Sequence, residues 1–225
     1  MTRRYEVISL DMFQTLVNIE GRREHVWRPI LQQNYSEERA KELGSQLLRS
    51  YYESAAEIRK QGSFWTSREI YFRGFKRVFQ QHRVDFDYAQ AVDILFAQHR
   101  RSALYEDTER FLQKVCREYQ VCIVSDTDNL MLPEFYLDYP VTLFTSEIYQ
   151  SYKNDSRNMM FHEVITRYGV APEQIIHIGD GSSDVLGAAR AGITACWINR
   201  TDACWEHEVK PDYTVASLDE CYRLL

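Results

Sequence analysis

The stretch YEVISLDMFQTL, residues 5–16, decides the fold of this chain. It starts as a short apolar strand, which runs into Asp11 and then into Thr15. An unpaired buried charge is costly, so a carboxylate that directly follows a buried strand is expected at the mouth of a sheet, where open α/β sheets bind their ligands. A single aspartate of this kind also fits the start of a turn, so the rest of the chain has to decide between the two.

The composition is that of an ordinary globular protein. The chain has 225 residues, 44% of them hydrophobic and 27% charged, enough for one large domain or for one domain with a smaller second one. No apolar run approaches the ~20 residues of a membrane span and no signal peptide is evident, so we expect a cytoplasmic protein without a membrane partner, as a monomer or a homodimer. The net charge of −6 argues against nucleic acid as a partner.

The sequence divides into a helical block and a block in which strands and helices alternate. Helical periodicity predicts helices at about 24–34, 36–60, 66–82 and 87–101. From residue 104 onward apolar runs alternate with helices, one of which is predicted at 155–168. The apolar runs lie near 121–124, 141–144, 174–178, 193–198 and 213–215. This alternation is typical of an α/β fold, a parallel sheet covered by helices on both faces. Because the first strand precedes the helical block, we expect a core of residues 1–19 and 103–225, with residues 20–102 inserted as an all-helical cap.

Polar groups follow three of the predicted strands. Asp11, Ser125 and Asp180 stand at the carboxyl ends of these strands, which a parallel sheet brings to one edge. Lys153 lies in the loop after the 141–144 strand, and therefore at the same edge. A lysine ammonium is a compact point charge, suited to a site that holds both a nucleophilic carboxylate and a phosphoryl oxygen.

These residues, in this order, resemble the four motifs of the haloacid dehalogenase (HAD) superfamily. The motifs are DMFQT at residues 11–15, Ser125, Lys153 and GDGSSD at residues 179–184. The helical insertion resembles the C1 cap of subfamily I of that superfamily. Each motif is short, but the ordered set is specific and spans nearly the whole chain. The resemblance implies a Rossmann-like core of the HAD type and a hydrolase that acts through an aspartate.

The resemblance also implies a role for each motif residue. Asp11 is expected to be the nucleophile, which forms a covalent aspartyl intermediate and so splits one difficult displacement into two steps. Thr15 is expected to orient the loop of Asp11, Ser125 to bind a phosphoryl oxygen, and Lys153 to neutralise charge between nucleophile and substrate.

The same resemblance implies a Mg²⁺ site. Asp180 is expected to bind the ion with Asp11 and the backbone carbonyl of Phe13, while Asp184 orients the water molecules of the metal. Mg²⁺ prefers hard oxygen ligands and usually keeps several waters, so a few carboxylates and a substrate phosphate suffice.

Two positions depart from the pattern of the superfamily's phosphatases. Those phosphatases carry a second aspartate two residues after the nucleophile as general acid and base, where this chain has Phe13. An aromatic residue there is similar to the haloacid dehalogenase branch, which attacks carbon and needs no acid for a halide. Asp126, where the superfamily often has Asn, adds a further carboxylate that could contact the substrate.

Three functions remain open from the sequence. The first is a Mg²⁺-dependent phosphomonoester hydrolase that acts on a small anionic metabolite, weakened by Phe13. The second is a carbon–halogen hydrolase similar to 2-haloacid dehalogenases, and the third is a non-catalytic protein that binds a ligand or a partner. In each case we expect the cap to choose the ligand, with candidate contacts in Arg22, Arg23, His25, Arg59, Lys60 and Trp65.

Overall fold

The computed structural model describes residues 3–225, and in this part of the chain the strand that ends at Asp11 lies inside a six-stranded sheet. The strand order is β5 (Val141–Thr145), β4 (Gln120–Ser125), β1 (Val7–Leu10), β6 (Ile175–Gly179), β7 (Thr194–Ile198) and β8 (Tyr213–Val215). Each neighbouring pair is parallel. The sequence prediction of a parallel α/β sheet is therefore confirmed.

Register explains why the polar residues meet. Leu10, the last residue of β1, is paired with Ile123 of β4 and with Ile178 of β6. The residues just beyond these three strands therefore emerge from the same edge of the sheet. β1 is buried along its whole length and lies between β4 and β6. Asp11, which follows β1, therefore lies next to the core at the centre of the sheet.

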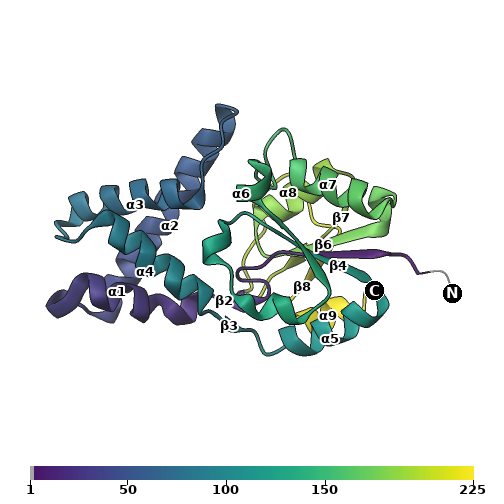
Figure 1. Ribbon diagram of the computed structural model, residues 1–225, viewed down its shortest axis with the longest axis horizontal. Helices are drawn as coiled ribbons and strands as arrows, with labels where there is room; N and C mark the ends of the chain where they lie inside the picture. Colours follow the sequence, from purple (N-terminus) through teal and green to yellow (C-terminus); the bar gives the residue numbers. More distant parts are fainter. Residues whose placement is uncertain (1–2) are drawn as a thin grey trace. The chain divides into compact units, whose positions relative to one another are not determined.

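Helices cover both faces of this sheet (Figure 1). α5 (Thr108–Glu118) and α9 (Leu218–Tyr222) lie on one face, and α6 (Ser146–Tyr149), α7 (Met159–Tyr168) and α8 (Ser182–Arg190) lie on the other. The core under α7 and α8 includes Val7, Val124, Phe161 and Val185. Because side chains alternate along a strand, Ser9 and His177 also point toward this second face.

α7 begins later than the helix at 155–168 that the sequence predicts. Asn158 has a left-handed backbone, with φ of 48°, immediately before the helix begins. The carboxylate of Asp155 accepts hydrogen bonds from the backbone N–H groups of Arg157 and Asn158, at 2.9 and 2.8 Å. These bonds hold residues 155–158 as a loop instead of a first helical turn.

The four helices expected in the cap are α1 (Arg23–Leu31), α2 (Glu37–Lys60), α3 (Ser67–His82) and α4 (Tyr88–Arg100). Their N-termini are capped by Ser36, Thr66 and Asp87, which satisfy backbone donors of the first turns of α2, α3 and α4. The remaining short elements are β2 (Val17–Asn18), which pairs with β3 (Ala103–Leu104), and turns of 3₁₀ helix at Glu20–Arg22, Gln32–Asn34, Asn129–Met131, Glu134–Asp138 and Pro172–Gln174. No helix within residues 3–225 has the length and apolar character needed to cross a membrane.

Contacts divide the chain into two compact units. The sheet unit holds the chain up to Asn18 with Leu104–Asp126 and Glu134–Leu225, and the helical unit holds Ile19–Ala103 with Thr127–Pro133. The sequence placed Thr127–Pro133 in the core. In the structure the buried carboxylate of Asp128 accepts hydrogen bonds from the backbone N–H groups of Ser67 and Arg68, at 2.8 and 2.9 Å, which fixes this segment to the first turn of α3.

Candidate active site

Three carboxylates converge at the carboxyl edge of the sheet. Asp11 follows β1, Asp180 follows β6, and Asp184 lies in the first turn of α8. Each offers a carboxylate oxygen, and these oxygens lie within 4.8 Å of one another. Residues from the beginning and the end of the sequence thus form one acidic cluster.

Lys153 bridges two carboxylates of this cluster, those of Asp11 and Asp184. Its ammonium donates to Asp11 Oδ1 at 2.7 Å and to Asp184 Oδ1, and the residue is only 2% exposed. Its backbone N–H donates to Asp126 Oδ1 at 2.8 Å. A buried charge is stable only when it is paired, and this lysine has two carboxylate partners.

Burial and charge together set the acidities at the site. Burial raises the pKa of Asp11 against the pull of the Lys153 ammonium, and it raises the pKa of Asp180 well above its usual value. Burial alone would also raise the pKa of Asp184, but Lys153 and His177 outweigh it and hold that pKa well below its usual range. Burial would lower the pKa of Lys153, yet Asp11 and Asp184 keep it raised, so the ammonium stays charged.

The glycines of the GDGSSD motif give Asp184 its position. A Cβ on Gly179 would lie 2.2 Å from Cγ of Asp184, far inside van der Waals contact, so the carboxyl group packs directly on this glycine. The backbone N–H of Gly181 donates to Asp184 Oδ2 at 2.9 Å. Asp184 is therefore fixed on one side by Gly179, at the end of β6, and on the other by the turn at Gly181.

The loop before α7 fixes Lys153. Asp155 accepts from the hydroxyl of Ser151 at 2.9 Å and from the backbone N–H of Tyr152 at 3.1 Å, in addition to its bonds at the start of α7. A Cβ on Gly187 would lie 2.3 Å from the carbonyl oxygen of Lys153, so α8 and this loop touch backbone to backbone. Lys153 could be predicted from the sequence, whereas Asp155 and Gly187, which hold its loop, could not.

The other motif residues lie in the same unit. Ser125 is buried at the end of β4, and Phe13 is half-buried in the turn after Asp11. Gln14, with φ of 60°, closes this turn by donating from its backbone N–H to the carbonyl of Val17 at 2.7 Å.

Thr15 is held through its backbone. Its side-chain hydroxyl, expected to orient the nucleophile loop, has no hydrogen-bond partner among residues 3–225. Its carbonyl oxygen instead accepts from the guanidinium of Arg200 at 2.9 Å, and Arg200 also pairs with Asp107 at 2.9 and 3.0 Å. The loop of the nucleophile is thus anchored through the backbone carbonyl of Thr15, which binds the guanidinium of Arg200.

Two residues that sequence analysis did not single out complete the cluster. His177 Nε2 lies 2.9 Å from Asp184 Oδ1, and its Nδ1 lies 2.7 Å from the hydroxyl of Ser9. Both residues are fully buried in neighbouring strands of the sheet. A polar pair at directly paired positions of two apolar strands is the one sequence signal that could have indicated them.

The six candidate ligand contacts of the cap all belong to the helical unit. Arg22 donates from Nε to Gln98 at 3.1 Å, Arg23 forms an ion pair with Glu20, and His25 is exposed. Arg59 and Lys60 lie in the last turn of α2, and the guanidinium of Arg73 stacks 3.6 Å from the ring of Trp65.

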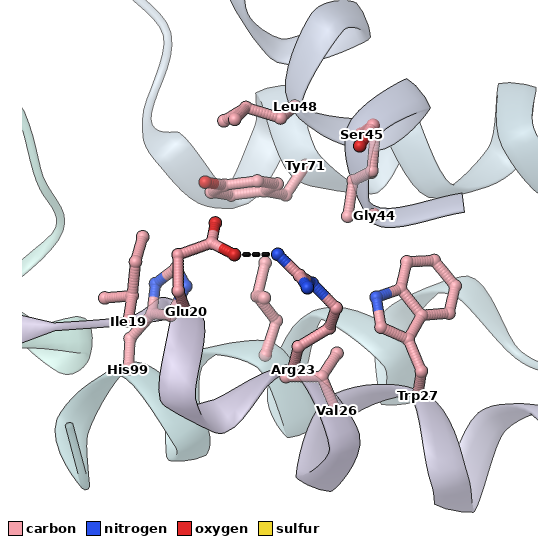
Figure 2. A pocket seen from close by; sticks show the side chains of 12 residues that line it. Ile19, Glu20, Arg23, Val26, Trp27, Gly44, Ser45, Leu48, Tyr71 and His99 are labelled. Carbon is pink, nitrogen blue, oxygen red and sulfur yellow. Dashed lines mark ion pairs between the residues drawn. The ribbon is translucent and has the colours of Figure 1, made fainter. Parts of the chain in front are cut away.

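A cavity of about 110 Å³ lies inside the helical unit (Figure 2). Trp27, Tyr71 and His99 line it, together with Glu20 and Arg23, which form an ion pair. Trp65 lines a separate hollow beside α3 and α4, of about 350 Å³. Of the six expected contacts, Arg23 lines the first hollow and Trp65 the second. Arg22, His25, Arg59 and Lys60 line neither of these two hollows.

The chain belongs to the haloacid dehalogenase-like hydrolase family, whose match covers residues 5–192. This confirms the resemblance carried by the four motifs. A phosphoserine phosphatase of Thermus thermophilus is 27% identical over 141 residues, which are 59% of this chain and 55% of that protein. The match thus spans little more than half the length of that relative.

Similar solved structures include dehalogenases and a magnesium-bound hydrolase. A dehalogenase solved with an intermediate has a TM-score of 0.82 at 19% identity, covering 100% of this chain and 99% of its own. The L-2-haloacid dehalogenase of Xanthobacter autotrophicus has a TM-score of 0.82 at 14% identity over 98% of both chains. A HAD hydrolase of Bacillus subtilis, bound to magnesium, has a TM-score of 0.80 at 18% identity over 99% of both. These likenesses show a shared fold, with a helical cap on a HAD core.

Proposed function

We propose that this protein is a Mg²⁺-dependent hydrolase of small phosphorylated metabolites that uses Asp11 as its nucleophile. The observation that carries the proposal is the contact of Asp11 with the Lys153 ammonium at 2.7 Å, inside a cluster whose carboxylate oxygens lie within 4.8 Å of one another. The phosphatase relative, at 27% identity, supports the phosphate branch.

The acidic cluster fits a divalent cation. Asp11, Asp180 and Asp184 bring three carboxylates against one ammonium, and all their donors are hard oxygens of the kind that Mg²⁺ prefers. Both oxygens of Asp184 are already engaged, by Lys153, His177 and the N–H of Gly181. We therefore assign direct binding to Asp11 and Asp180, with the carbonyl of Phe13, and an outer position to Asp184. The ion would stabilise negative charge that develops on a phosphoryl group.

The protein's own groups account for the rest of the proposed reaction. Lys153 keeps Asp11 in place and offers its ammonium to an anionic substrate, while Ser125 lies at the end of the neighbouring strand, where a hydroxyl can bind a phosphoryl oxygen. Attack by Asp11 on phosphorus would form an acyl phosphate and release the alcohol, and water would then free the phosphate. Phe13 cannot protonate the leaving oxygen, and such help is typically worth about 10²–10⁴-fold.

A carbon–halogen hydrolase is the second candidate, and Phe13 is the observation that favours it. A halide leaves without a proton, so an aromatic residue at this position costs such a reaction nothing. The buried Asp11–Lys153 contact weighs against a third candidate, a protein that only binds a ligand. The fold keeps this carboxylate and this ammonium together in a buried position, although removing both from water costs free energy.

The deciding experiment compares two products. Purified protein is assayed for phosphate release from p-nitrophenyl phosphate and for halide release from 2-chloropropionate, each with Mg²⁺ and with EDTA, and with Asp11→Asn as the blank. The proposal predicts phosphate release that requires both Mg²⁺ and Asp11. Phe13→Asp should raise turnover on alkyl phosphates by about 10²-fold or more, because it restores an acid. Halide release without a Mg²⁺-dependent phosphatase activity would reject the proposal in favour of the second candidate.

A further inference from the structure

A chain of buried polar contacts runs from the inside of the sheet to the nucleophile. The hydroxyl of Ser9 lies 2.7 Å from His177 Nδ1, and His177 Nε2 lies 2.9 Å from Asp184 Oδ1. The same Asp184 oxygen accepts from the ammonium of Lys153, which also donates to Asp11 at 2.7 Å. All five residues are at most 5% exposed, so water does not compete for these bonds.

The partners of Asp184 fix the direction of its hydrogen bond with His177. Both oxygens of Asp184 accept, Oδ1 from Lys153 and His177 and Oδ2 from the N–H of Gly181, so this carboxylate has no proton to donate. His177 must then donate from Nε2. The hydroxyl of Ser9, which can donate to Nδ1 or accept from it, provides the partner of the other ring nitrogen.

Packing against α7 also holds the imidazole. The rings of His177 and Phe161 of α7 form a T-shaped pair, with centroids 4.7 Å apart and planes at 79°. Ser9 and His177 are paired residues of β1 and β6, so the strand register itself sets their separation. The imidazole is therefore held by the sheet on one side and by α7 on the other.

We propose that His177 is a positioning residue, which orients the Asp184 carboxylate and, through it, keeps the Lys153 ammonium beside Asp11. Without the imidazole, Asp184 Oδ1 would lose one of its two donors and could turn further toward the ammonium, drawing it away from the nucleophile. The role in turnover rests on the function proposed above, whereas the contacts themselves do not.

The kinetic test compares three variants on p-nitrophenyl phosphate with Mg²⁺. His177→Leu should lower kcat by about 10–100-fold, the usual effect of removing a group that orients a metal-site carboxylate, and should leave KM within about threefold. His177→Gln, whose amide N–H can still donate to Asp184, should recover most of that loss. Ile176→Val is the matched control, because it alters the same strand on the opposite face, and it should keep kcat within about twofold. A His177→Leu enzyme whose kcat stays within twofold of the wild type would overturn the proposal.

A second readout is independent of turnover. Nitrogen NMR of the imidazole should show a proton on Nε2, and Ser9→Ala should shift the Nδ1 resonance while Nε2 keeps its proton. The ammonium resonance of Lys153 should be visible in the wild-type protein and should broaden or shift in His177→Leu. An Nε2 without a proton, or a Lys153 signal that His177→Leu leaves unchanged, contradicts the proposal even if the wild-type enzyme releases neither phosphate nor halide. A wild-type enzyme that releases neither phosphate nor halide would reject the proposed function, but not the positioning role of His177.

Discussion

Asp126→Asn should make this protein more stable at neutral pH, although it removes a charge that contacts the site. The side chain of Asp126 accepts from the backbone N–H of Lys153 at 2.8 Å, a bond that the oxygen of an asparagine can keep. Burial, with the nearby Asp184 and Asp11 carboxylates, raises the pKa of Asp126 from 3.8 to about 6, against the pull of Lys153. The ionised form is therefore disfavoured in the folded protein.

The size and the sign follow from this difference in pKa. About two pKa units correspond to roughly 3 kcal/mol, and partial solvent access reduces the expected effect to about 1–3 kcal/mol. Because the pKa of the folded state is the higher one, the wild-type protein keeps its full stability below pH 4 and loses this amount as the pH rises through 6. The asparagine variant avoids the loss, so the two proteins should be equally stable near pH 4 and differ fully by pH 7.5.

Urea unfolding between pH 4.5 and 8, with EDTA present, measures this difference. Asp155→Asn is the control of opposite sign. Burial alone would raise the pKa of Asp155, but hydrogen bonds from Asn158, Ser151 and Arg157 hold it below its usual value. That variant should be destabilised at pH 7.5 and should approach the wild type as the pH falls. If Asp126→Asn is less stable than the wild type at pH 7.5, or if its difference does not change with pH, the charge argument is refuted.

Three further substitutions test the contacts that build the site, each by urea unfolding at pH 7.5. Gly179→Ala should cost about 1–3 kcal/mol or more, because the new methyl group would overlap Cγ of Asp184. Lys153→Met should cost about 3–5 kcal/mol without divalent cations, since it leaves two buried carboxylates without their cation, and Mg²⁺ should restore part of the loss. Asp107→Asn should cost several kcal/mol by weakening the paired hydrogen bonds from Arg200, which itself holds the nucleophile loop. A loss below about 0.5 kcal/mol in any of the three would contradict the contact concerned.

The sheet could be predicted because its central strands are buried on both faces. Residues 121–124 are continuously apolar, and residues 175–178 are apolar except for His177. A polar residue that follows such a run is expected at the carboxyl edge of the sheet. Asp11, Ser125 and Asp180 were visible for that reason. α6, only four residues long, was not predicted, because so short a helix shows no period.

The supporting contacts could not be predicted because they join residues far apart in sequence. A lone histidine in an apolar strand looks like a core residue until α8 brings Asp184 within 2.9 Å of His177. The carboxylate of Asp128 caps the start of α3, about 60 residues earlier in the chain, and no local pattern indicates that pairing. The guanidinium of Arg22, a candidate ligand contact, donates to Gln98, again across most of the helical unit.

The charge of the site decides more about its chemistry than Phe13 does. Asp11, Asp180 and Asp184 outnumber the single buried ammonium, and any haloacid or phosphate brought beside them adds a further anion. Like charges in a poorly solvated site repel strongly, so either substrate would need a compensating cation before the nucleophile could approach it. A proton on Asp180, whose pKa burial raises well above its usual value, relieves part of this repulsion without a metal. Metal dependence alone therefore does not separate the two reactions, and the identity of the leaving group has to. Phe13→Asp provides that separation, because a carboxylic acid at this position helps an alkoxide to leave and offers nothing to a halide.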